Sequence, residues 1–131
     1  MRLNSKKGAV LLIAVFIIFL CSILVMGFLE VAVTEIEISR NLRDGAITAY
    51  IADTGVEAAV YDLLNGGDGN ISRTEFTVNG NTYYYTVNQT NKFGNIYTIE
   101  STGSFKNFQR VVEARIGITG IFAFLQYWKE K

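Results

Sequence analysis

One uncharged stretch near the N-terminus constrains this chain more than any other feature. Residues 8–29 contain no charged side chain, and the basic residues Arg2, Lys6 and Lys7 precede them. A helix needs about 20 apolar residues to cross a bilayer core of about 30 Å. Ala9–Leu29 supplies 21, so this segment predicts a transmembrane helix.

A removable secretory signal is a poor explanation of this segment. The apolar core of such a signal usually spans about 7 to 15 residues and is followed by a small-x-small cleavage site. Here the run is longer, and the nearest triplet of that kind, Ala32-Val33-Thr34, is a weak match. We therefore expect a retained, single-pass segment in the cytoplasmic membrane. Because basic residues precede it and Glu30, Glu35 and Glu37 follow it, we expect the N-terminus in the cytoplasm and the C-terminus outside.

Composition argues against several classes of function. The 12 basic and 12 acidic residues cancel, so no net charge favours nucleic acid as a partner. The chain has no histidine, and its one cysteine, Cys21, lies in the apolar run, where we expect an inert small hydrophobe. No paired carboxylates stand in a recognisable setting. We expect no enzymatic activity, no catalytic residue, no cofactor and no metal site.

The helical pattern continues beyond the membrane segment without a break. Apolar residues recur at steps of three and four through about residue 64, which predicts an amphipathic helix over residues 30–64. Its expected core-facing stripe comprises Ile38, Leu42, Ala46, Ala49, Val56, Val60 and Leu63. The first clear stop is the glycine-rich cluster Asn65–Asn70. One helix over about 9–64 is therefore expected.

The second half of the chain changes to a strand-like period. Two β-rich runs flank Asn79-Gly80-Asn81, a strong hairpin signal. In the last run Val112, Ala114, Ile116 and Ile118 share one face. One buried face suits a sheet packed on a helix. The sequence thus predicts an α+β fold, with the long N-terminal helix packed on a four-stranded antiparallel sheet at about 74–118.

The C-terminal tail, residues 119–131, is rich in aromatic residues and ends in charged ones. Two interpretations stay open for it. The tail is either a short helix that closes the sheet or an exposed aromatic patch used for contact with a partner or a membrane interface.

Taken together, these features resemble type IV pilins and pseudopilins. The basic leader with "KKG", the apolar run that follows it, and the helix-plus-sheet head have the plan of that superfamily. The nearest resemblance is to the PilX-like group of minor pilins. It rests on "NLRD" at residues 41–44, on the A-x-x-A-D-x-G-V-E-A-A stretch at 49–59, and on late strands such as "IYTIESTG" and "QRVVEARI".

The resemblance implies a processing site and a set of partners. A prepilin peptidase would cut after Gly8, remove the leader 1–8 and methylate Ala9. The mature chain would comprise the membrane segment 9–29 and an extracytoplasmic head, 30–131. Its implied partners are other pilin subunits, the peptidase, the inner-membrane pilus assembly machinery and membrane lipid.

Position 13 departs from the family pattern. Most pilins carry glutamate as the fifth mature residue, where it faces the N-terminal amine of a neighbour, whereas this chain has Ile13. A carboxylate in lipid is costly unless paired, so that glutamate acts as an assembly register device. A subunit without it suits a tip, a primer or a sparse component better than a repeating shaft.

Two functional hypotheses follow. In the first, the chain is a structural minor pilin or pseudopilin that enters a type IV pilus or related secretion filament by helix–helix packing. In the second, it is an uncleaved, single-pass anchored domain whose sheet binds something outside the cell. Cleavage of the Gly8–Ala9 bond distinguishes them.

Overall fold

The computed structural model describes residues 3–131, with side chains described from Lys7 onward. The first two residues of the expected leader, and the side chains of Arg2 and Lys6, lie outside the described residues. The chain divides into two compact units, Met1–Arg40 and Asn41–Lys131. Helix α1, Leu3–Leu64, supplies residues to both. The predicted single helix is confirmed, and it begins earlier than residue 9.

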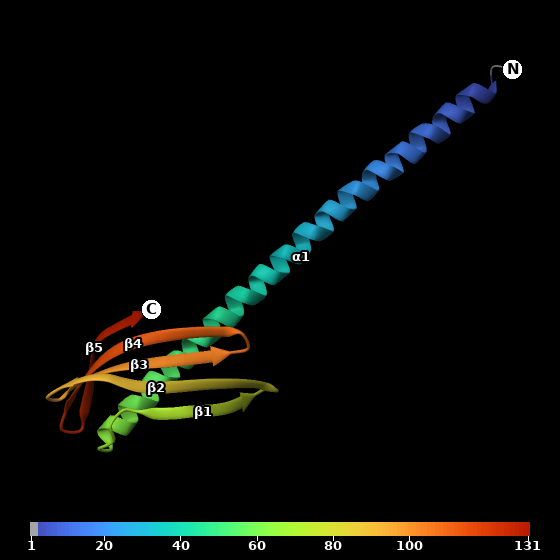
Figure 1. The fold of residues 1–131 in the computed structure, drawn as a ribbon. Coiled ribbons are helices and arrows are strands. Elements are labelled where there is room, and N and C mark those ends of the chain that lie inside the picture. Colours follow the sequence, from blue (N-terminus) through green and yellow to red (C-terminus); the bar gives the residue numbers. More distant parts are fainter. Residues whose placement is uncertain (1–2) are drawn as a thin grey trace. The chain divides into compact units, whose positions relative to one another are not determined.

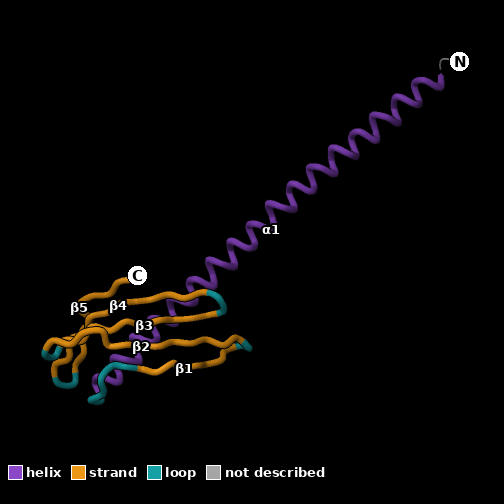
Figure 2. Tube along the Cα trace, in the orientation of Figure 1, coloured by secondary structure: helices purple, strands orange, loops and turns teal. Residues whose placement is uncertain are grey.

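The unit Asn41–Lys131, which is called the head from here on in place of the expected range 30–131, contains the last turns of α1 and one antiparallel sheet. Its five strands follow the chain order as a meander, so each pairs with its sequence neighbours (Figures 1 and 2). Figure 2 shows the β1–β2 and β3–β4 turns at one end of the sheet and the β2–β3 and β4–β5 turns at the other. The strands are β1 Ile71–Val78, β2 Asn81–Phe93, β3 Ile96–Phe105, β4 Phe108–Thr119 and β5 Phe122–Glu130. The predicted α+β class is confirmed.

The expected number of strands is wrong by one, because the aromatic tail forms β5. This strand pairs antiparallel with β4 from Thr119↔Phe122 to Val112↔Glu130. A register shift leaves Gln126 without a partner residue on β4, which breaks the alternation of period two that marks a strand in sequence. Aromatic side chains also stand on both faces of β5. The helical interpretation of residues 119–131 is therefore wrong.

The face of α1 that packs on the sheet also differs from the expected stripe. Val56 and Leu63 are buried as predicted, but Leu42 is 71% exposed, and Ala46 and Ile38 are exposed as well. The buried positions include several small or polar residues that an apolar pattern does not identify. They are Asp44, Gly45, Thr48, Ile51, Ala52, Gly55, Val56, Ala59 and Leu63.

Small residues are buried here because the helix approaches β3 very closely. A Cβ atom at Gly103 would lie 2.5 Å from both the Ala52 nitrogen and the Thr48 oxygen. The Ser101 hydroxyl donates a hydrogen bond of 2.6 Å to the carbonyl oxygen of Ala52, and a Cβ atom at Gly55 would collide with that hydroxyl. The helix backbone thus rests directly on the middle of β3.

The hydrophobic core of the head lies along this contact. Its larger side chains come from the inner faces of β2, β3 and β4 and from the last turns of α1. The buried cluster comprises Ala52, Val56, Ala59, Leu63, Val87, Ile99, Val112, Ala114 and Ile116. The predicted inward face of β4, from Val112 to Ile116, is confirmed. At the β1–β2 turn Asn79 and Gly80 both have positive φ, at 50° and 76°, as the predicted Asn-Gly hairpin requires.

Candidate functional site

The membrane segment is the first candidate for a functional surface. From Lys7 onward α1 is long and apolar enough to cross a membrane, which is consistent with a single-pass membrane protein. Every residue from 7 to 40 is exposed. In water that much exposed apolar side chain would be costly, since burial contributes about 25 cal/mol per Å². Lipid or neighbouring apolar helices are the surroundings that this segment requires.

The residues expected at the processing site lie together in the first turns of α1. Gly8, Ala9 and Ile13 are all helical and exposed. Nothing outside its own helix lies within 4 Å of where a Cβ atom would stand on Gly8, so its open surroundings leave room for another molecule. Ala9 and Ile13 are four residues apart and therefore share one helix face. The Ile13 side chain is 58% exposed and presents only hydrocarbon to its surroundings.

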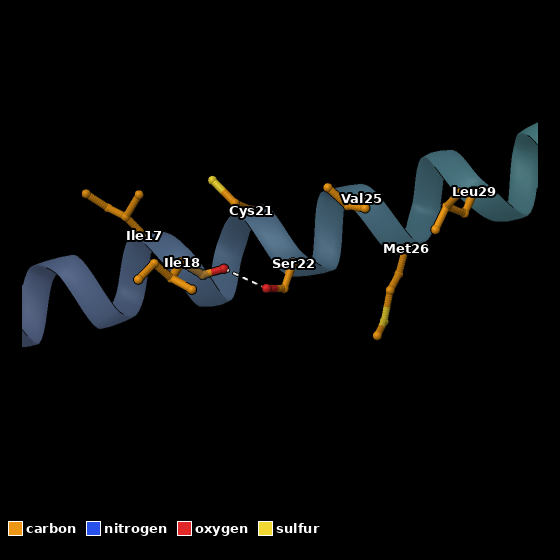
Figure 3. Close-up of a pocket in the computed structure, with 7 residues that line it drawn as sticks. All are labelled: Ile17, Ile18, Cys21, Ser22, Val25, Met26 and Leu29. Carbon is orange, nitrogen blue, oxygen red and sulfur yellow. Dashed lines mark hydrogen bonds between the residues drawn. The ribbon is translucent and has the colours of Figure 1, made fainter.

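A shallow groove of about 470 Å³ follows one side of the membrane segment (Figure 3). Cys21 and Ser22 lie in its middle, between larger side chains; the lining comprises Ile17, Ile18, Cys21, Ser22, Val25, Met26 and Leu29. The Ser22 hydroxyl donates to the Ile18 carbonyl oxygen at 2.8 Å, the bond drawn in Figure 3. The hydroxyl is thereby satisfied in an apolar setting. Small residues of this kind let a neighbouring helix approach closely.

In the head, Asp44 is a buried carboxylate that the sequence analysis did not single out as a site. It is 5% exposed, and its two oxygens have different cationic partners. Lys106 Nζ lies 2.7 Å from Oδ2, and Arg43 Nη2 lies 3.1 Å from Oδ1. The hydrogen bond from Lys106, and after it that from Arg43, lowers the pKa of Asp44 below its ordinary value, against the opposing effect of burial. Asp44 is the last residue of the "NLRD" stretch, but its partner Lys106 lies 62 residues further along the chain. The local sequence therefore gives no indication of this ion pair.

Lys106 reaches Asp44 from the β3–β4 turn, where it has a positive φ of 53°. Such a backbone conformation is uncommon for a residue other than glycine. The turn therefore places a cation over a carboxylate of α1, and the ion pair fastens the end of the β3–β4 hairpin to the helix.

A second charged cluster lies at the end of β5. Glu100 and Glu113 are directly opposite each other in the β3–β4 pairing, an arrangement that is unfavourable for like charges. Lys131 Nζ lies 2.6 Å from Glu100 Oε2 and 3.0 Å from Glu113 Oε2. These hydrogen bonds, first to Glu100 and then to Glu113, raise the pKa of Lys131 above its ordinary value. The cation thus offsets the repulsion between the two glutamates.

Trp128 ties β5 to the helix. Its indole Nε1 donates to Asp53 Oδ1 at 3.0 Å, so the Asp53 of the A-D-x-G motif holds the edge strand. Ala52 and Gly55 of the same stretch form the close contact with β3, and Ala59 is buried in the core. The motif at 49–59 is therefore a packing motif in this structure.

Comparison of the chain with protein families, with curated proteins and with solved structures found no match. A long N-terminal apolar helix whose last part packs on an antiparallel sheet is compatible with a pilin-like fold.

Proposed function

We propose that the chain is a structural subunit of a type IV pilus or a related filament machine, made as a precursor and cut between Gly8 and Ala9. The mature N-terminus would begin at Ala9 and be methylated there. The membrane segment would hold the subunit in the cytoplasmic membrane, with the head outside, until it joins other pilin subunits through helix–helix contacts.

One observation carries this proposal: α1 is a single helix from Leu3 to Leu64. A plain membrane anchor needs only about 20 apolar residues and is commonly joined to its domain by a linker. Here the anchor helix itself supplies Ala52, Val56 and Leu63 to the core of the head. A subunit built this way has its membrane segment and its folded head on one continuous element, as a helix-packed filament requires.

Ile13 supports a particular place for the subunit within that proposal. Without a carboxylate at position 13, the subunit offers nothing to the N-terminal ammonium of a neighbour. Its own ammonium at Ala9 remains able to pair with the glutamate of another subunit. One-sided pairing of this kind fits a subunit at the end of a filament or one present in few copies.

Intact mass of the membrane-extracted protein tests the proposal directly. The chain is expressed with and without a prepilin peptidase. We expect loss of Met1–Gly8 and addition of one methyl group only when the peptidase is present. Gly8→Leu is expected to keep the full precursor mass, because a bulky side chain replaces the open position beside the cut bond. The matched control Gly27→Ala, also exposed on α1 with open space around it, is expected to be processed normally.

A chain that keeps its full mass under both conditions would overturn the proposal. The protein would then be an anchored extracytoplasmic domain without a filament, and its function would be sought in what the head binds.

A further inference from the structure

Two register shifts in the sheet bring side chains to its outer face, the face turned away from α1, around Arg115. In β2 the shift leaves Thr90 unpaired between Gln89↔Ile99 and Asn91↔Thr98. Up to Gln89 the odd-numbered residues of β2 face the helix, as the buried Val87 shows. Beyond Thr90, Asn91 and Phe93 are instead on the outer face.

The shift in β5 has the same effect from the other side. Leu125 pairs with the buried Ile116, Gln126 is unpaired, and Tyr127 then pairs with Arg115. Without this register shift, Gln126 rather than Tyr127 would pair with Arg115. Bulges commonly re-aim side chains at functional sites, and here both place an aromatic residue near the same cation.

Phe124 is the third aromatic residue near Arg115, after Phe93 and Tyr127. A Cβ atom at Gly117 would collide with the far end of its ring, so the ring lies against this glycine on the outer face. Gly117 is in turn the pairing neighbour of Ile96 on β3. A groove of about 270 Å³ lies beside it, lined by Asn91, Phe93, Ile96, Thr98 and Arg115.

Arg115 is a cation without a carboxylate. Strand β2 has no acidic residue. The acidic residues of β3, β4 and β5 are Glu100, Glu113 and Glu130, and each is in an ion pair with Lys131 or Arg110. Within the described part of the chain, Arg115 forms no ion pair. An exposed guanidinium in a groove that also contains the apolar side chains of Phe93 and Ile96 is therefore left available to an outside anion.

We propose that this outer-face groove binds a segment of a partner protein in which an acidic side chain stands between apolar ones. The carboxylate would pair with the Arg115 guanidinium, whose geometry suits a two-point hydrogen bond. The flanking apolar side chains would lie on Phe93, Ile96 and Phe124, and aromatic and arginine residues of this kind are those that dominate binding energy at interfaces.

The charge pattern favours a peptide over a lipid surface. Electrostatic binding to anionic lipid needs a cluster of about four to eight basic residues. Among the described residues that line the groove, Arg115 of β4 is the one cation. The inference concerns the head alone and does not depend on cleavage at Gly8.

Peptide selection on the full-length chain tests the inference. The protein is held in nanodiscs of zwitterionic lipid, random 12-residue peptides are selected on it, and empty nanodiscs remove background. The strongest binder is then synthesised with its acidic residue intact or replaced by the amide, and its affinity is measured by fluorescence anisotropy. A soluble short-chain phosphatidylserine is the lipid probe.

We expect selected peptides to carry Asp or Glu between apolar residues. Arg115→Gln, or the amide replacement, is expected to weaken binding about tenfold or more. The matched control is Arg73→Gln, on β1, whose guanidinium lies 3.9 Å from the Tyr84 ring centroid; it is expected to keep the wild-type affinity. Selection without acidic preference, equal binding by the Arg115→Gln chain, or Arg115-dependent binding of the lipid alone would each overturn the inference.

Discussion

At the scale of single residues, the head depends on a contact where only small side chains fit. Gly55 lies within α1, where replacement of glycine by alanine ordinarily stabilises a helix by about 1 kcal/mol. Here the new Cβ would collide with the Ser101 hydroxyl and lie 3.2 Å from Tyr85 and Val87 atoms. We expect Gly55→Ala to destabilise the head by about 1 to 3 kcal/mol, as overpacking does.

Gly45 provides the matched control on the same helix. Outside the adjoining helix backbone, the nearest atom to a Cβ there is Arg110 Nη2, at an ordinary contact distance of 3.7 Å. Gly45→Ala is therefore expected to stabilise the head by up to about 1 kcal/mol. Fluorescence of Trp128, the chain's one tryptophan, reports thermal unfolding of the head in detergent. If both variants changed the melting temperature in the same direction, the close packing described at Ser101 would be contradicted.

Asp44 makes the stability of the head depend on pH. Its pKa is lowered in the folded state, mainly by Lys106, so the folded head binds fewer protons at this group than the unfolded chain does. The stabilisation is therefore complete above the ordinary carboxyl pKa of 3.8 and is lost as the pH falls through the lowered value. We expect Asp44→Asn to melt below the wild type at pH 7, with the difference closing below about pH 4.

Lys106→Met is the control for the origin of this effect. Lys106 is the largest cause of the lowered pKa of Asp44. In the Lys106→Met background, the melting-temperature difference caused by Asp44→Asn should therefore depend much less on pH. An Asn variant whose melting temperature stays below the parent's by the same amount at every pH would contradict the ion-pair explanation.

At the scale of elements, β5 covers the edge of β4 and is fastened to α1 through Trp128. Ending the chain after Gly120 removes that bond and the ion pairs of Glu130 and Lys131. We expect the melting temperature of the head to fall by about 10 °C or more, since 1 kcal/mol corresponds to about 4–8 °C in a domain of this size. Amide hydrogen exchange along β4 should rise with it. Because the truncation removes Trp128, far-UV circular dichroism follows the unfolding of both chains.

Trp128→Phe tests the side-chain hydrogen bond to Asp53 while the rest of β5 stays in place. It keeps one aromatic ring but loses the bond to Asp53 and part of the indole packing, so a loss of at least about 1 kcal/mol is expected, again followed by circular dichroism. Unchanged exchange in β4 after truncation would show that β5 does not protect its neighbour.

The extent to which sequence predicts this fold differs from element to element. The unbroken helix, the Asn79-Gly80 turn and the inward face of β4 were predictable, because local periodicity and turn chemistry determine them. The helix face was not, because Asp44 is buried beside Lys106, 62 residues further along the chain, and Thr48 is buried where the helix backbone meets Gly103 of β3. Strand β5 was missed because the unpaired Gln126 interrupts its alternation, and the groove at Arg115 was missed because two register shifts create it.

At the scale of the whole molecule, Ile13 is expected to limit how the subunit assembles. Under the proposed function, Ile13→Glu supplies the carboxylate that a neighbour's N-terminal ammonium requires. We expect the fraction of the protein recovered in sheared filaments to rise severalfold, as measured by quantitative immunoblotting against the membrane fraction.

Ile17→Glu is the matched control, because it introduces the same charge one helical turn further along, on the same face of α1. It should not increase incorporation, since a charge at that depth is costly without a partner. Equal behaviour of the two variants would argue against a register function for position 13.

The contact between α1 and β3 also has a consequence for how this sequence can diverge. Gly55 and Ser101 fill one space, and Gly103 admits the backbone at Thr48 and Ala52. A larger residue at position 55 is tolerable only if position 101 loses its hydroxyl. No side-chain change can make room for a larger residue at position 103, because the atoms that face it belong to the backbone of α1. In homologous chains positions 55 and 101 should therefore change together, while position 103 stays glycine.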